Sequence, residues 1–322
     1  MSRLKLLPLF ISLFFLLSKE ISAEIRTWTS STGSKIQAEL VSFANNMIVL
    51  RSADGRNITL PIYKLGPSDQ KFVQGLYSNK ATNVRVAAYN VEFGKNASPE
   101  EIGKMFKPYN LDIIGFNEVP DGDWTARVGK ILGMKHTYVG KISSANHKDK
   151  YKSILSLTPL QSTVEHELTV KRSRSWNPAS VVRAVTQING IPISFYSLHV
   201  SCSLNSHNTG HAYRLANEIL PKDKTDRIIV LGDFNNHFGD NALKKIEQAG
   251  MRATWEDLKI DVSKKSTFHA LNPKINLGVI DHIFYSTKSK AKVTEGGIIE
   301  LKKALSDHKP VWAEFSFPQN LK

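Results

Sequence analysis

Six short polar motifs lie at the ends of apolar segments, and this arrangement limits the possible folds of the chain more than any other feature. From Val84 to Pro318 the apolar segments alternate with amphipathic helical stretches. This alternation is typical of an α/β sheet domain. In chain order, the motifs contain Asn90, Asn117-Glu118, His199, Gly232–Asn235, Asp281-His282 and Ser306–His308.

The first two motifs follow strands that are joined by one helix. The strand Val84–Val91 carries Asn90, a helix is predicted over Ser98–Phe106 with Ser98 as its N-cap, and the next strand ends at Glu118. Asn90 and Glu118 therefore lie at corresponding strand ends. A carboxylate after a buried strand is costly unless it is exposed or paired. Because hard cations such as Mg²⁺ prefer oxygen ligands, Glu118 is a candidate metal ligand.

The motif Gly232-Asp233-Phe234-Asn235 is the most specific of the six. It ends the apolar run Arg227–Leu231. In an extended chain, Asp233 and Asn235 would project to the same face, which pairs a carboxylate acceptor with an amide donor. In-line attack of water on phosphorus needs one group to orient and deprotonate water and another to hold a phosphoryl oxygen. The motif therefore indicates phosphoester chemistry.

Two further motifs combine carboxylates with imidazoles. Asp281 belongs to the apolar strand around Val279–Phe284, and His308 precedes the last strand. A carboxylate that faces an imidazole fixes its tautomer and raises its basicity. His199 ends another apolar strand. The lone cysteine, Cys202, excludes internal disulfides and is interpreted as a small hydrophobic residue rather than a nucleophile.

The N-terminus is predicted to be a signal peptide over residues 1–23. Arg3 and Lys5 precede the apolar run Leu6–Leu17, and Ser22-Ala23 supplies small residues for cleavage. Lys19-Glu20 ends the run before it reaches the ~20 residues of a spanning helix. We therefore expect no stable membrane span and a secreted or periplasmic protein, with an uncleaved anchor as the alternative.

Residues 24–78 form a separate small unit, and residues 79–83 form a linker. Alternating strands surround the turn signals Asn45-Asn46 and Asp54-Gly55, and a short helix with Ser68 as N-cap follows. This pattern predicts an SH3-like β-barrel. The stretch resembles the Sla-homology type of SH3-like module in Arg26-Thr27-Trp28, Ala38-Glu39-Leu40, Leu60-Pro61 and Asp69-Gln70. The resemblance implies peptide or surface docking.

The order and spacing of all six motifs over residues 84–318 resemble the endonuclease/exonuclease/phosphatase superfamily. This superfamily includes DNase I, exonuclease III-type apurinic endonucleases, sphingomyelinases and inositol polyphosphate phosphatases. The resemblance implies a four-layer αββα sandwich and a Mg²⁺-dependent phosphodiesterase, with Mn²⁺ as an alternative metal. Further alternatives are a lipid phosphodiesterase of the sphingomyelinase type and a catalytically inactive binding protein.

The resemblance also assigns roles to the motif residues. It implies Glu118 as the main metal ligand, with Asn90 and Asp307 near the same cation. It implies that Asp233 orients the attacking water. It also implies that Asn235 and His308 contact the phosphate oxygens and that Asp281 pairs with His308. His199 matches the second histidine of the DNase I-like and sphingomyelinase-like branches.

The net charge of +14 favours a polyanionic partner, and nucleic acid is the leading substrate. The basic stretch Lys171–Trp176 offers Arg172 and Arg174 as contacts to a phosphate backbone. Arg183 is either a phosphate contact or a structural ion-pair partner. We expect a monomer. The sequence does not decide whether the substrate is DNA or RNA, or whether cleavage is endonucleolytic or exonucleolytic.

Overall fold

The structure is a computed structural model, and it describes residues 25–44, 47–78, 81–144, 149–169, 179–200, 206–272, 274–319 and 321. The chain divides into two compact units, with the boundary between Val73 and Gln74. The predicted signal peptide lies outside the described residues. The second of the two is the larger unit.

The first unit contains a four-stranded antiparallel sheet in chain order. Its strands are β1 (Arg26–Thr29), β2 (Lys35–Ala44), β3 (Met47–Ser52) and β4 (Asn57–Pro61). The buried side chain of Trp28 belongs to its core, and the indole donates a hydrogen bond to the Ala38 carbonyl at 2.9 Å. The small β module predicted from the sequence is therefore present.

The helix that follows begins earlier than the sequence predicted. Helix α1 spans Pro67–Ser78, so Ser68 lies inside it and is not its N-cap. The Gly66 carbonyl already accepts hydrogen bonds from the backbone amides of Asp69 and Gln70. The Asp69 carboxylate instead accepts hydrogen bonds from the Thr29 amide and Arg26, both at 2.6 Å.

The larger unit is built on two six-stranded mixed sheets. The first, here the β5 sheet, has the order β15-β16-β5-β6-β8-β7. Its strands are β5 (Thr82–Asn90), β6 (Ile113–Val119), β7 (His136–Val139), β8 (Tyr151–Ser156), β15 (Lys292–Ile298) and β16 (Val311–Phe317). The second, here the β12 sheet, has the order β13-β14-β12-β11-β10-β9. Its strands are β9 (Leu160–Glu167), β10 (Ser180–Ile188), β11 (Ile191–His199), β12 (Ile228–Asp233), β13 (Met251–Ala253) and β14 (Asp281–Ser286).

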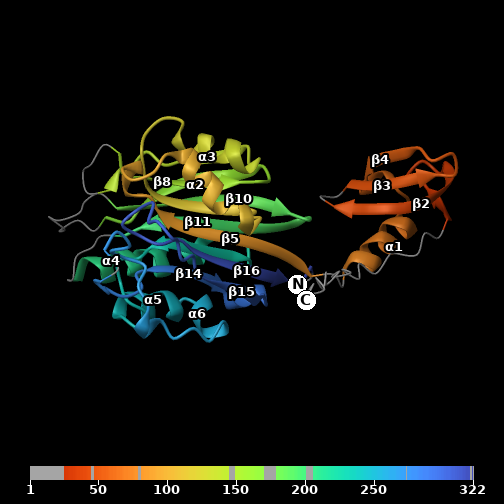
Figure 1. Cartoon of the computed structure of the whole chain (residues 1–322). Coiled ribbons are helices and arrows are strands. Elements are labelled where there is room, and N and C mark those ends of the chain that lie inside the picture. Colours follow the sequence, from red (N-terminus) through yellow and green to blue (C-terminus); the bar gives the residue numbers. More distant parts are fainter. Residues whose placement is uncertain are drawn as a thin grey trace, which may run out of the picture. The chain divides into compact units, whose positions relative to one another are not determined.

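Helices cover the outer face of each sheet, which gives the predicted four-layer sandwich (Figure 1). Those on the β5 sheet are α2 (Pro99–Phe106) and α3 (Trp124–Leu132), and those on the β12 sheet are α4 (Ser206–Arg214), α5 (Asn241–Gln248) and α6 (Thr254–Asp257). Helix α2 begins as predicted, because Ser98 and Glu101 form a reciprocal capping box.

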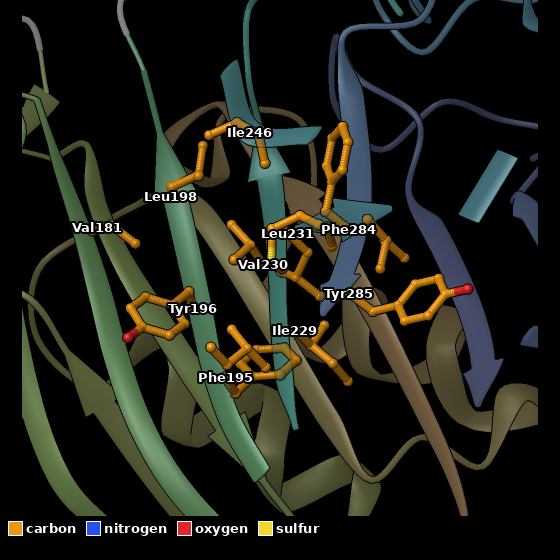
Figure 2. Close-up of a cluster of buried hydrophobic side chains, with 14 of the residues drawn as sticks. Val181, Phe195, Tyr196, Leu198, Ile229, Val230, Leu231, Ile246, Phe284 and Tyr285 are labelled. Carbon is orange, nitrogen blue, oxygen red and sulfur yellow. The ribbon is translucent and has the colours of Figure 1, made fainter. Parts of the chain in front are cut away.

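The two sheets pack closely against each other through small and aliphatic side chains. A Cβ atom at Gly115 on β6 would overlap Leu231 of β12 and Ser197 of β11, so only glycine permits this approach. Figure 2 shows Leu231 and its neighbours on β12 among the buried side chains of the adjacent strands. This packing fixes the strand ends of both sheets, and with them the polar motifs.

Gly232 is a second position where a side chain cannot fit. Its φ is +134°, and a Cβ there would overlap the Leu198 carbonyl oxygen. Gly232→Ala should therefore lower the free energy of unfolding by about 3 kcal/mol, because backbone strain and overlap both act. Gly250→Ala is the matched control, since φ is +84° but the nearest atom lies 3.8 Å away. Urea unfolding of both variants tests this, and equal losses would rule out the overlap.

Candidate active site

Asp233 lies at the centre of the polar motifs because of strand register. Its backbone pairs with His199 on the parallel strand β11 and with Asp281 on the antiparallel strand β14. From the β5 sheet, the Asn117 side chain accepts a hydrogen bond from the Asp233 amide at 2.9 Å. Both sheets therefore position this carboxylate, which is 1% exposed.

Four polar groups surround the Asp233 carboxylate. Oδ1 accepts a hydrogen bond from the Asn235 amide at 2.9 Å, and Oδ2 accepts one from Asn90 Nδ2 at 3.0 Å. The Nε2 atoms of His199 and His308 lie 3.4 Å and 3.6 Å from Oδ2. Burial raises the pKa of Asp233 above its ordinary value, whereas the His308 charge lowers it. A carboxylate in this setting can orient a water molecule and accept its proton.

His308 and Asp281 form the contact that the sequence predicted. The Asp281 Oδ2 atom lies 2.9 Å from His308 Nδ1, and both side chains are buried. Burial alone would disfavour the charged imidazole, but the Asp281 and Asp233 carboxylates raise the pKa of His308 to about 10. His308 is therefore a cation at neutral pH, with Nε2 directed at the Asp233 side of the site.

Glu118 reaches the site through a β-bulge. The pairing of β6 with β8 shifts between Asn117 and Val119, and Glu118 has a φ of +52°. This break in the alternation redirects its side chain. Glu118 Oε2 lies 2.8 Å from the Lys150 ammonium, and Oε1 lies 3.7 Å from His199 Nε2. Burial alone would raise the pKa of Glu118, but the nearby His199 and Lys150 outweigh burial and lower the pKa below its ordinary value. The carboxylate therefore stays ionised.

The side of the site around Glu118 and Asp307 fits a divalent cation. The pKa of Asp307 is raised by burial and by the neighbouring carboxylates of Glu92 and Glu118, against the influence of His308. This crowding of negative charge favours a cation, and the oxygen donors suit a hard one. Asn90 completes the predicted set, although its Nδ2 faces Asp233 and its Oδ1 accepts the Glu92 amide.

Asp233, Asp281 and His308 also bring potential ligand atoms within 4.8 Å of one another. His308 Nδ1 contacts Asp281, and the raised pKa keeps the ring protonated in the metal-free protein, which disfavours it as a ligand. The oxygen donors around Glu118 and Asp307 suit a hard cation better. Asp281 Oδ1 is buried without a hydrogen-bond partner among the described residues.

Asn235 joins the cluster by a route that the sequence did not predict. It follows the end of β12 with a φ of +47°, so the extended-strand argument for a shared face with Asp233 is wrong. The turn instead directs Nδ2 to within 3.2 Å of His199 Nε2 and 3.0 Å of the Val200 carbonyl. Burial lowers the pKa of His199 to about 4, so its ring is neutral at pH 7.

The predicted substrate-binding arginines do not join this cluster. Arg183 forms an ion pair with Asp223, 2.9 Å from Nε to Oδ2, and Nη2 donates a hydrogen bond to Ser194. The sequence left two interpretations of Arg183 open, and its geometry is that of a structural ion-pair partner. Arg172 and Arg174 lie outside the described residues.

The structure adds residues that the sequence analysis did not single out. Asn117 and Ser306 lie inside the recognised motifs: Asn117 holds Asp233, and Ser306 Oγ donates a hydrogen bond to the Asn90 carbonyl at 2.8 Å. Their motif positions could have indicated them. Lys150 had no such signal, because it belongs to a polar stretch without periodicity.

Comparisons with known proteins identify the family of the chain and support its fold. The sequence profile of the Endonuclease/Exonuclease/phosphatase family matches residues 87–308, and that of SLA1 homology domain 1 matches residues 18–81. The search of curated proteins gave no match.

Several solved structures share the fold of the larger unit at low sequence identity. A mannosyl-6-phosphatase, Bt3783 of Bacteroides thetaiotaomicron, is 19% identical over 73% of this chain and 100% of its own, with a TM-score of 0.58. D. rerio TDP2 complexed with single-strand DNA product is 14% identical over 73% and 99%, with a TM-score of 0.59. An endonuclease/exonuclease/phosphatase from Beutenbergia cavernae is 17% identical over 73% and 72%, with a TM-score of 0.60. With a profile match over more than half of its length, this chain belongs to the Endonuclease/Exonuclease/phosphatase family.

Proposed function

We propose that this protein is a secreted, Mg²⁺-dependent phosphodiesterase that hydrolyses nucleic acid by direct attack of water on phosphorus. The observation that carries this proposal is the buried Asp233 carboxylate, held between Asn90, His199, Asn235 and the cationic His308. The predicted signal peptide over residues 1–23 supports secretion.

The residues divide the work of hydrolysis between them. Asp233 orients the attacking water and accepts its proton as the water oxygen bonds to phosphorus. The P–O bond to the leaving oxygen breaks in the same displacement, and solvent water protonates the leaving oxygen. The Asp281-bound His308 cation donates a hydrogen bond to a phosphoryl oxygen, and a charged donor is the stronger partner for an anion. Asn235 Nδ2 and the neutral His199 ring hold a second phosphoryl oxygen. A Mg²⁺ ion held by Glu118 and Asp307 would act as a Lewis acid and would neutralise negative charge on the phosphoryl group.

Nucleic acid is the proposed substrate because the protein carries a large net positive charge. The net charge of +14 favours a polyanion. Among the proteins of similar fold, TDP2 was solved with a single-strand DNA product, which supports the same substrate class here. We further propose a monomer in which residues 24–78 dock a peptide or a surface.

A lipid phosphodiester is the second candidate substrate. The Phe268 ring packs at a tilt against His308 with ring centroids 4.9 Å apart, and the same segment exposes the aliphatic side chains of Leu271, Ile275 and Leu277. Apolar side chains beside a site could contact acyl chains. Within the described residues, none of the helices has the length and apolar character needed to cross a membrane.

A substrate panel separates these candidates. Purified protein with Mg²⁺ would be assayed in parallel on plasmid DNA, single-stranded DNA, RNA and sphingomyelin vesicles. The proposal predicts cleavage of a nucleic acid and little or no release of phosphocholine. Release of phosphocholine without cleavage of DNA or RNA would contradict it in favour of the lipid enzyme, and inactivity on all four would contradict both.

The basic stretch Lys171–Trp176 gives a further expected result. If Arg172 and Arg174 contact the backbone, Arg172→Ala with Arg174→Ala should reduce the slope of log affinity against log salt by roughly 2, because each neutralised phosphate releases counterions. Nucleic-acid binding would be measured across a salt series with the Glu118→Gln variant as background, so that no substrate is cleaved. Lys244→Gln with Lys288→Gln removes the same charge elsewhere and is the control. An unchanged slope would exclude the stretch from the interface.

A further inference from the structure

A short turn at the edge of the site exposes an aromatic ring that no step of the proposed hydrolysis uses. The 3-10 turn Glu92–Gly94 follows strand β5, which ends at Asn90. Phe93, in the middle of this turn, is 36% exposed. Because Asn90 belongs to the cluster around Asp233, the turn and its ring lie beside the catalytic groups.

Two adjacent residues of this turn have a backbone conformation that residues with side chains rarely adopt. The φ angles of Glu92 and Phe93 are +44° and +46°, in the left-handed region. A bulky residue there is an outlier, because its Cβ atom crowds the following carbonyl group. Such residues persist where the surrounding structure determines their conformation, and they cluster at active sites and ligand-binding sites. The strained turn is therefore a candidate binding element.

Contacts on both sides hold the turn in this conformation. On the side of the site, the Asn90 Oδ1 atom accepts a hydrogen bond from the Glu92 amide at 3.1 Å. On the other side, a Cβ atom at Gly94 would lie 3.0 Å from the indole nitrogen of Trp124, so the backbone packs directly against helix α3. Because this backbone is fixed, the Phe93 ring is preorganised for a ligand, which lowers the entropic cost of binding.

Two lysines lie near the ring, and each is paired with a carboxylate. The ammonium nitrogens of Lys150 and Lys95 lie 5.4 Å and 6.0 Å from the centroid of the Phe93 ring. Lys150 also contacts Glu118 Oε2 at 2.8 Å, which places the ring at the Glu118 edge of the site. Lys95 pairs with Glu92 at 3.1 Å. These pairs balance the charge at this edge, so it offers a ligand mainly the exposed part of the aromatic ring.

The chemistry of this edge distinguishes between possible ligands. An acyl chain would desolvate the two neighbouring ammonium groups without offering them a partner, whereas the carbonyl oxygens of a base can accept their hydrogen bonds. Stacking on an aromatic side chain is favourable for every base, but a base inside a duplex must first leave its stack. We infer that Phe93 stacks on an unpaired base next to the scissile phosphate, which makes single-stranded nucleic acid the preferred substrate. This inference rests on the proposed hydrolysis of nucleic acid.

Calorimetric titration of the full chain with tetrathymidylate in EDTA tests this inference, because binding is then measured without cleavage. Phe93→Leu keeps an apolar side chain at the same strained φ but removes the aromatic ring. It should weaken binding by about tenfold, the equivalent of ~1.4 kcal/mol. Phe93→Tyr keeps the ring and should bind like the wild type. The control is Leu157→Ala, which removes an exposed apolar side chain at the opposite end of β8 from Lys150 and should retain wild-type affinity.

A tetramer of abasic sugars is the matched ligand, because it has the same phosphates but no bases. The Phe93→Leu and Phe93→Tyr variants should bind it equally well. The inference would be overturned if the wild type did not bind tetrathymidylate, if Phe93→Leu bound it as tightly as the wild type or Phe93→Tyr, or if Phe93→Leu lost affinity only for sphingomyelin vesicles. Cleavage of nucleic acid in the substrate panel would leave the proposed function intact after any of these results. Phe93-dependent binding without cleavage would instead contradict the proposed hydrolysis alone.

Discussion

Glu118→Gln should reduce the rate of Mg²⁺-dependent phosphodiester hydrolysis by about 10³-fold. Removal of a group that stabilises transition-state charge has an effect of this size. The substitution keeps the size of the side chain but removes the ionised carboxylate that the bulge at φ +52° directs into the site. Because Asp307 and Glu92 remain, weak residual metal binding should appear as a higher Mg²⁺ requirement. Steady-state rates across a Mg²⁺ series measure both effects.

Glu100→Gln is the matched control for this experiment. Glu100 forms an ion pair with Arg127 at 2.9 Å on the surface, so its loss also removes one carboxylate from an ion pair. This variant should retain wild-type hydrolysis. Near wild-type activity of folded Glu118→Gln at saturating Mg²⁺ would contradict the assignment of Glu118 as the main ligand.

Asp281→Asn should slow hydrolysis by about 10²-fold, within the range for general acid–base and orienting groups. The amide retains the shape of the carboxylate but no longer stabilises the His308 cation 2.9 Å away. His308→Ala should cost at least as much, and the double variant little more, because paired catalytic groups act as a unit. Asp261→Asn, at an exposed carboxylate that caps a short turn, is the control. Additive losses in the double variant would contradict the pairing.

The same pair predicts a pH dependence of stability. The pKa of His308 in the folded protein, about 10, lies above its ordinary value of roughly 6.5. The pair therefore stabilises the fold fully below about pH 6.5, and this contribution is lost as the pH rises through 10. In Asp281→Asn the loss should occur at lower pH. Thermal unfolding of metal-free protein between pH 6 and 10.5 would measure the shift, and identical profiles would contradict the raised pKa.

Strand order and motif position predicted that His199, Asp233 and Asp281 would lie close together, and the structure places them so. They are adjacent because β11, β12 and β14 pair in register: His199 and Asp233 end their strands, and Asp281 begins the antiparallel strand β14. The sandwich follows from the same alternation of strands and helices. These features depend on hydrophobic periodicity, which is explicit in the sequence.

Side-chain direction could not be predicted where the backbone departs from regular geometry. A regular β6 strand would direct Glu118 towards helices α2 and α3 with Phe116, and only the bulge reverses this. Asn235 reaches His199 through a turn with positive φ. For Arg183, the sequence does not state which face of the sheet the guanidinium occupies, and its partner Asp223 is forty residues away. Such contacts depend on the assembled tertiary structure.

Hydrolysis of bis(p-nitrophenyl) phosphate tests the central claim most directly, because this diester requires no particular base, sugar or lipid. The proposed mechanism predicts that metal-free protein releases no p-nitrophenol until Mg²⁺ is added. In H₂¹⁸O, the label should then appear in the monoester phosphate. Release that continues in EDTA, or no release at any Mg²⁺ concentration, would contradict metal-dependent attack of water on the phosphodiester.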